Sequence, residues 1–195
     1  MRKVLILGAT GSLARVAIDR FLKHTDATLT LFARNTRTLK RIDSTRAHVV
    51  EGDVLDSVAL KRAMAGQDVV YANLAGDLER MAKNIVKAMD ETGLRRLIFI
   101  SSMGIYDEVP GQKYRSVLDP YRDAAKVIEA SDLDYTILRP AWFTDADEID
   151  YETTQKGDPF RGGVVSRKSL ADLIVKLAQS PDLEVRHSLG VSKPE

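Results

Sequence analysis

Cysteine is absent from this chain of 195 residues. Its absence excludes disulfide bonds, thiolate metal sites and cysteine nucleophiles, and it is compatible with a reducing cytosol. Long apolar runs are missing as well, because no stretch approaches the ~20 residues that a membrane-spanning helix needs. The apolar run at residues 4–7 is too short for the hydrophobic region of a signal peptide. We therefore expect a cytoplasmic protein that does not bind membranes.

The chain also has little net charge, formally +1 at pH 7. This balance gives no reason to expect nucleic acid as a partner. Metal-binding patterns are missing, since the three histidines share no motif. The acidic run at 145–150 lacks the glycine and the terminal glutamate of a calcium loop, so we expect a solvated loop and no metal site.

What the chain has instead is an alternation of strand and helix patterns over its whole length. Strands are predicted at 4–7, 27–33, 48–54, 68–76, 95–101 and 135–139. Helices are predicted from residue 13 onward and at 36–42, 56–66, 78–93, 121–131 and 166–181. Asp119 and Pro120 fit the N-cap and the first turn of the helix at 121–131.

This alternation indicates βαβ units, and hence an α/β fold with a Rossmann-type doubly wound parallel sheet and helices on both faces. We expect one domain over 1–195. The stretches 102–119 and 141–163 show no clear period. Both follow the carboxyl end of a predicted strand, where ligands bind in this architecture, so we expect them to form walls of a substrate site. The alternative is that they are long surface loops.

The first strand runs directly into the sequence GATGSLA at 8–14. A strand that ends in glycines and leads into a helix aims free backbone N–H groups and a positive dipole end at one point, which suits a phosphate. The alternative is a tight turn with no ligand. The spacing G-x-x-G-x-x-A differs from the dinucleotide fingerprint G-x-G-x-x-G.

This spacing resembles that of the extended and atypical short-chain dehydrogenase/reductases. The segments EGDVLD, YANLAG, LIFISSMGIY and LDYTILRPAW follow in the order of the atypical NmrA-like, or NAD(P)H-binding, group. The resemblance covers essentially the whole chain and implies a dinucleotide cofactor. It places around the pyrophosphate Gly8, Thr10, Gly11, Ser12 and Leu13. By the same resemblance, the adenine should meet Asp53 and Val54. The adenine ribose and the pyrophosphate should lie along Asn73, Leu74 and Ala75. The nicotinamide should be flanked by Ser101, Pro140, Ala141 and Trp142.

The end of the second strand bears on the choice of cofactor. It carries Arg34 and Asn35 and no carboxylate. An NAD site uses a carboxylate to accept from the ribose 2′-OH, whereas a guanidinium can bind the 2′-phosphate of NADP. Arg37 could add a second contact. The sequence therefore favours NADP(H) over NAD(H), unless these arginines are only a solvated face, as we expect for Lys40, Arg41 and Arg46.

The catalytic pair of most short-chain dehydrogenases, Tyr-x-x-x-Lys, does not occur in this chain. In that pair the lysine lowers the pKa of the tyrosine so that the phenol can exchange a proton. Its absence departs from the family pattern and puts alcohol–ketone dehydrogenation in doubt. The catalytic candidates that remain are Ser102, Tyr106 and Tyr121, with strand capping and core packing as their alternatives. Trp142 forms either a substrate wall or part of the core.

Three functions stay open. The first is an NADPH-dependent reductase of a flavin, quinone or similar small acceptor, in which water supplies the proton and the protein orients the reactants. The second is a non-catalytic dinucleotide sensor that changes its affinity for a protein partner, in the manner attributed to NmrA. The third and weaker one is a sugar-nucleotide epimerase or dehydratase, although such enzymes usually have the Tyr–Lys pair and a larger C-terminal domain.

Overall fold

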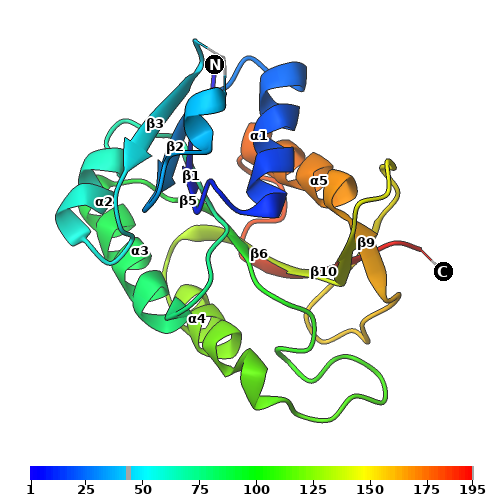
Figure 1. Ribbon diagram of the computed structural model, residues 1–195. Coiled ribbons are helices and arrows are strands. Elements are labelled where there is room, and N and C mark those ends of the chain that lie inside the picture. The colour runs from blue at the N-terminus through cyan, green and yellow to red at the C-terminus, as the bar shows by residue number, and fades with distance from the viewer. Residues whose placement is uncertain (43–44, 195) are drawn as a thin grey trace.

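The computed structural model describes residues 1–42 and 45–194, without the side chain of Lys40. Within these residues the central sheet has eight strands in the order β3-β2-β1-β4-β5-β6-β10-β8 (Figure 1). Their bounds are β1 Lys3–Leu7, β2 Thr28–Ala33, β3 Ala47–Glu51, β4 Val69–Ala72, β5 Arg96–Ile100, β6 Asp134–Pro140, β8 Glu152–Thr154 and β10 His187–Ser192. The pairings are parallel except that of the edge strand β8 with β10. The strand order reverses between β1 and β4, which is where this architecture binds ligands.

Helices cover both faces of the sheet (Figure 1). One face carries α1 (Ser12–His24) and α5 (Arg167–Gln179), which pack together, and the other carries α2 (Ser57–Met64), α3 (Leu78–Thr92) and α4 (Asp119–Glu129). Strand β1 shows why its sequence is continuously apolar: Val4 and Ile6 join the core on the α1–α5 side, and Leu5 and Leu7 join the core on the other. All four side chains are fully buried. The predicted doubly wound α/β fold is confirmed.

Two local predictions are wrong. Residues 36–42 do not form a helix but only a single 3-10 turn at Leu39–Arg41. Asp119 is the first residue of α4 rather than its N-cap, which is Leu118. The carboxylate of Asp119 is engaged elsewhere, since it accepts from the Tyr114 hydroxyl at 2.6 Å.

The sequence also missed several short strands. Within 141–163, for which no regular structure is predicted, lie β8 and β7 (Trp142–Thr144), and β7 pairs with β9 (Val164–Ser166) in a separate two-stranded sheet. Strand β10 was not predicted: it has only two apolar residues, Leu189 and Val191, and the small residues Ser188, Gly190 and Ser192 around them are also buried. A Cβ at Gly190 would lie 2.4 Å from Thr154 Oγ1, so β10 needs a glycine where it meets β8. None of the described helices has the length and apolar character needed to cross a bilayer.

Candidate functional site

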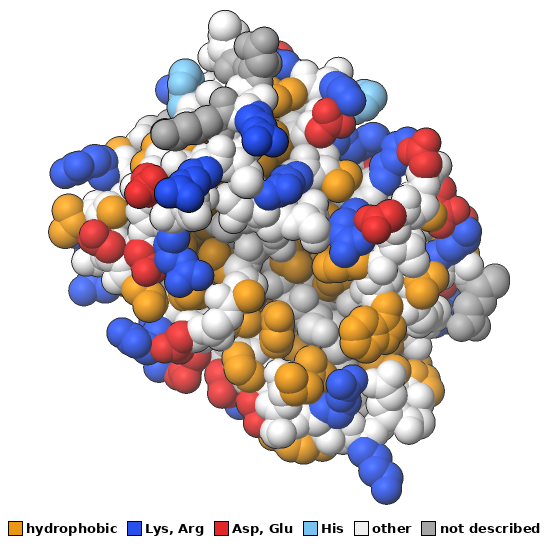
Figure 2. Space-filling view, viewed as in Figure 1, with side chains coloured by type: hydrophobic (Ala, Val, Ile, Leu, Met, Phe, Trp, Pro, Cys, Tyr) orange, Lys and Arg blue, Asp and Glu red, His pale blue; other side chains and the backbone are white. Residues whose placement is uncertain are grey.

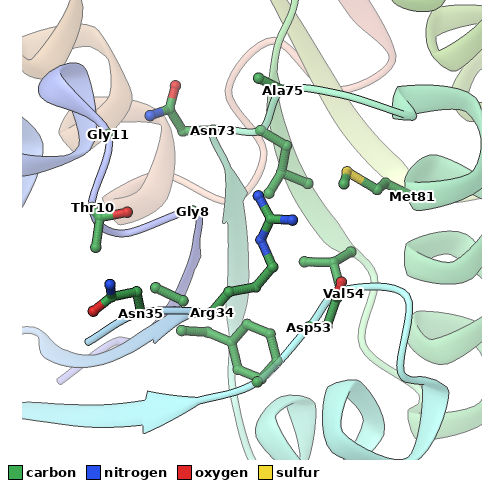
Figure 3. Close-up of a pocket in the computed structure, with 14 residues that line it drawn as sticks. Gly8, Thr10, Gly11, Arg34, Asn35, Asp53, Val54, Asn73, Ala75 and Met81 are labelled. Atoms are coloured by element: carbon green, nitrogen blue, oxygen red, sulfur yellow. The ribbon is translucent and has the colours of Figure 1, made fainter. Parts of the chain in front are cut away.

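A cavity of about 270 Å³ opens beyond the carboxyl ends of β1, β2, β3 and β4 (Figure 3). We name it the glycine-loop cavity. It brings together the residues that the sequence suggests for the pyrophosphate, ribose, adenine and 2′-phosphate: Gly8, Thr10, Gly11, Arg34, Asn35, Asp53, Val54, Asn73, Leu74 and Ala75. Its lining also includes Phe32, Ala33, Gly52 and Met81. The first three are sequence neighbours of predicted residues. Only Met81, on the first turn of α3, had no neighbour in the sequence that was predicted to line the site.

The glycines are needed because two loops meet here with almost no space between them. Gly8 has a φ of +76°, and a Cβ on it would lie 2.0 Å from the Asn73 carbonyl oxygen. A Cβ on Gly11 would lie 2.4 Å from Asn73 Nδ2. The chain can therefore bring its main chain right up to the cavity, as a phosphate-binding turn requires.

The first turn of α1 completes this loop. Ser12 is exposed at the start of the helix, and Leu13 is buried in the core. Neither side chain lines the glycine-loop cavity, so only their backbone amides are suited to the role that the resemblance implies. Amides in the first turn of a helix have no partner within the helix and point outward from its end. This end of the cavity fits an anion.

Arg34 extends from the end of β2 into the middle of the cavity, with Val54 and Met81 on one side of it and Thr10 on the other (Figure 3). It is exposed, and no carboxylate among the described residues pairs with it. Asp53, the one acidic residue of the lining, instead accepts from the backbone amide of Leu55 at 2.9 Å. The guanidinium of Arg34 is thus available to an anionic ligand.

The neighbouring cations are arranged differently. Arg37 is exposed and does not line the cavity; its backbone amide donates to Asn35 Oδ1 at 3.1 Å. Arg41 is exposed, as expected for a solvated face, and the side chain of Lys40 lies outside the described part of the chain. Arg46 is not solvated as expected, because it donates to the carbonyl oxygens of Leu22, Thr25 and Ala27.

A second cavity, of about 340 Å³, lies beyond the carboxyl ends of β5 and β6. We name it the aromatic cavity. It brings together the residues suggested beside the nicotinamide with two of the catalytic candidates: Ser101, Pro140, Ala141, Trp142, Ser102 and Tyr121. The sequence missed its other lining residues, Met103, Gln112, Arg115, Val117, Leu118 and Phe143, which lie in or beside the two stretches without a clear period. Both stretches therefore line this cavity.

The aromatic cavity combines a flat apolar wall with the polar side chains of Ser101, Ser102, Gln112, Arg115 and Tyr121. Trp142 is 62% exposed and Phe143 37%, so Trp142 is not a core residue. Figure 2 shows hydrophobic side chains gathered around a hollow on this face of the molecule. The Ser101 hydroxyl is buried and has no hydrogen-bond partner among the described residues, whereas the Ser102 hydroxyl donates to the Met103 carbonyl at 3.1 Å. An unpaired buried hydroxyl beside a cavity can be satisfied by a polar group of a ligand.

Tyr106, the third catalytic candidate, lies elsewhere. It lines a separate cavity between the segments 106–112 and 156–159. Its hydroxyl donates to Glu129 Oε1 at 2.7 Å, and Ser188 Oγ lies 3.3 Å away. Burial raises the pKa of this phenol above its ordinary value, with a smaller contribution from Glu129 in the same direction. The structure thus separates Tyr106 from Ser102 and Tyr121.

A buried ion pair anchors the loop that follows β5. Arg139 on β6 is fully buried and pairs with Glu108, whose side chain is 4% exposed. Glu108 also accepts from the backbone amides of Gly104 at 3.0 Å and Tyr106 at 2.9 Å. Burial alone would raise the pKa of Glu108, but its own backbone amide, Arg139 and the amides of Gly104 and Tyr106 outweigh burial and hold the pKa below its usual range. No local pattern in the sequence pointed to this pair.

The structure does bring a tyrosine hydroxyl and a lysine within hydrogen-bond distance, without the usual sequence spacing. Lys176 Nζ lies 3.0 Å from the Tyr151 hydroxyl, which donates to Asp172 Oδ2 at 3.0 Å. Burial raises the pKa of Tyr151 and outweighs the hydrogen bond with Lys176, which acts to lower it as a catalytic lysine would. Neither residue lines either cavity. This cluster connects the 141–163 stretch to α5, and Arg20 of α1 joins it through Asp172.

The family follows from a direct comparison. Residues 8–181 match the model of a family described as NAD(P)H-binding. The chain belongs to this NAD(P)H-binding family. The resemblance inferred from the sequence is thereby confirmed, and the glycine-loop cavity, with its main-chain cradle and available guanidinium, fits the cofactor that the family name implies.

Solved structures and curated relatives agree with this membership. A Rossmann-fold NAD(P)-binding family protein of Shigella flexneri is 45% identical, with a TM-score of 0.90 over 100% of this chain and 94% of that one. A short-chain dehydrogenase/reductase of Veillonella parvula, solved in complex with NADP, is 30% identical, with a TM-score of 0.90 over 99% and 95% of the two chains.

Among curated proteins, an uncharacterised sugar epimerase of Bacillus subtilis, YhfK, is 22% identical over 94% of this chain and 91% of its own. Phenylcoumaran benzylic ether reductase PT1 of Pinus taeda is 26% identical over 70% of this chain. The match spans 47% of the pine reductase, about half its length.

Proposed function

We propose that this protein is a cytoplasmic, NADPH-dependent reductase of a small, flat, electron-poor acceptor such as a flavin or a quinone. The observation that carries the proposal is the pairing of two cavities. One combines a main-chain anion cradle with an available guanidinium, and the other, beyond the neighbouring strands, has an aromatic wall and no Tyr–Lys pair in its lining.

The preference for NADPH over NADH rests on Arg34. Its guanidinium lies in the glycine-loop cavity and no carboxylate follows β2, so a 2′-phosphate meets attraction there rather than repulsion. Arg37 lies outside the lining and has no contact with the cofactor in this proposal. The Veillonella relative solved with NADP supports the same preference.

The acceptor is assigned to the aromatic cavity. Trp142, Phe143 and Tyr121 offer flat surfaces on which a conjugated ring can stack. Bound NADPH supplies a hydride. The chain's own part is to orient the two ring systems and to exclude water from the apolar side, while solvent supplies the proton through the open side of the cavity. The pine relative, itself named a reductase, supports this class of reaction.

The test is a calorimetric titration of NADPH and NADH into the wild type, Arg34→Ala and Arg37→Ala. Loss of a charge-assisted contact with the 2′-phosphate predicts about tenfold weaker NADPH binding in Arg34→Ala and no change for NADH. Arg37→Ala is the matched control and is expected to bind both as the wild type does. Equal losses for both dinucleotides in Arg34→Ala would overturn the assignment of NADPH.

Turnover is measured separately, from the loss of NADPH absorbance when FMN, riboflavin or menadione is added. Oxidation of NADPH with at least one acceptor supports the reductase. Tight dinucleotide binding without oxidation across the panel would favour the sensor instead. The sugar epimerase alternative has YhfK in its favour, but the lining of the aromatic cavity contains no Tyr–Lys pair of the kind that such enzymes usually have.

A further inference from the structure

The first residue of α5 reaches back to the glycine loop at the start of the chain. Arg167 Nε lies 3.2 Å from Ser12 Oγ, although the two residues are 155 positions apart in the sequence. Ser12 directly follows Gly11, which lines the glycine-loop cavity, and it begins α1. The guanidinium therefore lies beside the turn whose backbone amides form the anion cradle.

Two further contacts hold this guanidinium in place. Its Cζ atom lies 5.1 Å from the centre of the Phe143 ring, which lines the aromatic cavity. Its Nη1 atom lies 2.7 Å from Asp145 Oδ1. The Arg167 side chain is only 22% exposed, whereas the side chain of Asp145 is 90% exposed. Arg167 is thus held beside the glycine loop and against a ring of the aromatic cavity, although it lines neither cavity, and its carboxylate partner lies in solvent.

The carboxylate of Asp145 contributes little to the stability of its ion pair with Arg167, whereas the guanidinium of Arg167 is well suited to bind a phosphate. An ion pair with a carboxylate this exposed is screened by water and adds little stability. A guanidinium carries five N–H donors in a planar fork that matches the oxygens of a phosphate. Contacts to Ser12 and Asp145 use two of them. A doubly charged pyrophosphate on the first turn of α1 would compete strongly for the same guanidinium.

We propose that Arg167 is a pyrophosphate-binding residue and that Asp145 forms an ion pair with its guanidinium only until a dinucleotide binds. The proposal rests on dinucleotide binding at the glycine-loop cavity, as in the proposed function. When a dinucleotide binds, its pyrophosphate takes the place of the Asp145 carboxylate, while the contact with Ser12 already holds Arg167 beside the glycine loop. Arg167 thereby closes the cradle from the side of α5, next to the aromatic cavity. The acidic run at 145–150, predicted as a solvated loop, contributes this displaceable partner.

The experiment is calorimetry of NADP⁺, NAD⁺ and adenosine 2′-monophosphate with four variants. Arg167→Ala is expected to bind both dinucleotides roughly tenfold more weakly, by the same factor, and the monophosphate as the wild type does, since that probe has no pyrophosphate. Asp145→Asn is expected to bind both dinucleotides about twofold or more tightly, because the competing charge is gone. Arg167→Lys keeps the charge but not the fork, and is expected to lie in between.

Lys168→Ala is the matched control. Lys168 is the next residue, pairs with Asp147 in the same acidic run, and makes no contact with Ser12 among the described residues, so its loss should leave all three probes unaffected. Circular dichroism and the melting temperature establish whether each variant is folded. If Arg167→Ala does not fold, the binding measured for Asp145→Asn and Arg167→Lys tests the proposal instead.

Unchanged dinucleotide binding in Arg167→Ala, or weaker binding in Asp145→Asn, would overturn the role of Arg167 and leave the proposed function in place. Equal losses for the monophosphate and the dinucleotides would mean that Arg167 supports the fold rather than the pyrophosphate. A wild type that binds neither dinucleotide would overturn the proposed function itself, and this inference with it.

Discussion

The glycine-loop cavity and the aromatic cavity lie along the same edge of one sheet but are built in different ways. The first is lined mainly by residues within a few positions of the ends of β1 to β4. Much of the second is lined by residues from the long connections after β5 and β6. The backbone of the sheet fixes the geometry of the first. The second depends on contacts between residues far apart in the sequence, so the two should respond differently to mutation.

The largest effect is expected at the ion pair that anchors the connection after β5. Glu108→Ala leaves the guanidinium of Arg139 buried without its carboxylate, and it also removes the acceptor of the Gly104 and Tyr106 amides. We expect a loss of about 3–5 kcal/mol in the free energy of unfolding, measured with urea. The matched control is Asp107→Ala, the exposed neighbour, which should cost less than about 1 kcal/mol.

This variant also separates the two cavities. In whatever fraction stays folded, the KM for the acceptor should rise while the Kd for NADPH stays near that of the wild type. A parallel loss of NADPH affinity would show that the two cavities are not independent.

The same pair gives stability a pH dependence. Because the pKa of Glu108 is held below its usual range in the folded protein, the folded state binds fewer protons than the unfolded chain at that group. Its contribution is fully present above the ordinary carboxyl pKa of about 4.3 and is lost as the pH falls through the lowered value. Unfolding free energies of the wild type and Glu108→Gln, measured from about pH 6 to about pH 3, should therefore converge toward acid. A difference that stays constant over this range would contradict the assignment.

In the glycine-loop cavity the most severe change is Gly8→Ala. Its Cβ would collide with the Asn73 carbonyl, and its φ of +76° disfavours any side chain. We expect a cost of about 2–4 kcal/mol in unfolding free energy and a loss of dinucleotide binding, followed by urea unfolding and calorimetry. Gly163→Ala is the control, since its Cβ would meet nothing within 4 Å. Wild-type affinity for NADPH in Gly8→Ala would remove the reason for placing the pyrophosphate there.

Local patterns indicated the glycine turn and the arginine of the first cavity, and the family resemblance named the rest of its predicted lining; neither indicated the long-range contacts on which the second cavity depends. The run at residues 4–7 predicted a doubly buried strand, and the glycines after it predicted the turn, because each depends only on neighbouring residues. Arg139 and Glu108 are 31 positions apart, and Arg167 and Ser12 are 155 apart, so no short pattern contains either contact. Strand β10 was not predicted for a related reason. Its small residues are buried because the strand pairs with β6 and β8, and not because the residues themselves are hydrophobic.

A smaller effect is expected from the aromatic wall. Trp142→Ala removes a ring that is 62% exposed, so it should change the unfolding free energy little while raising the KM for the acceptor roughly tenfold. Trp142→Phe retains a flat ring and should recover much of the loss. Both are measured by steady-state oxidation of NADPH, with calorimetry of NADPH to separate an effect on the nicotinamide from an effect on the acceptor. A KM that does not move in Trp142→Ala would place the acceptor elsewhere.

The smallest effect is expected at the phenols, and it bears directly on the chemistry of the aromatic cavity. Tyr121 lines that cavity, and Tyr106 does not. If solvent supplies the proton, Tyr121→Phe should keep kcat within about threefold of the wild type, well short of the hundredfold or more that general acid catalysis contributes. Tyr106→Phe should also keep kcat but lower the unfolding free energy by about 1 kcal/mol, because its hydrogen bond to Glu129 is lost. A hundredfold fall of kcat in Tyr121→Phe alone would instead make this phenol the proton donor, and the aromatic cavity would then contain a catalytic residue that acts without the Tyr-x-x-x-Lys spacing.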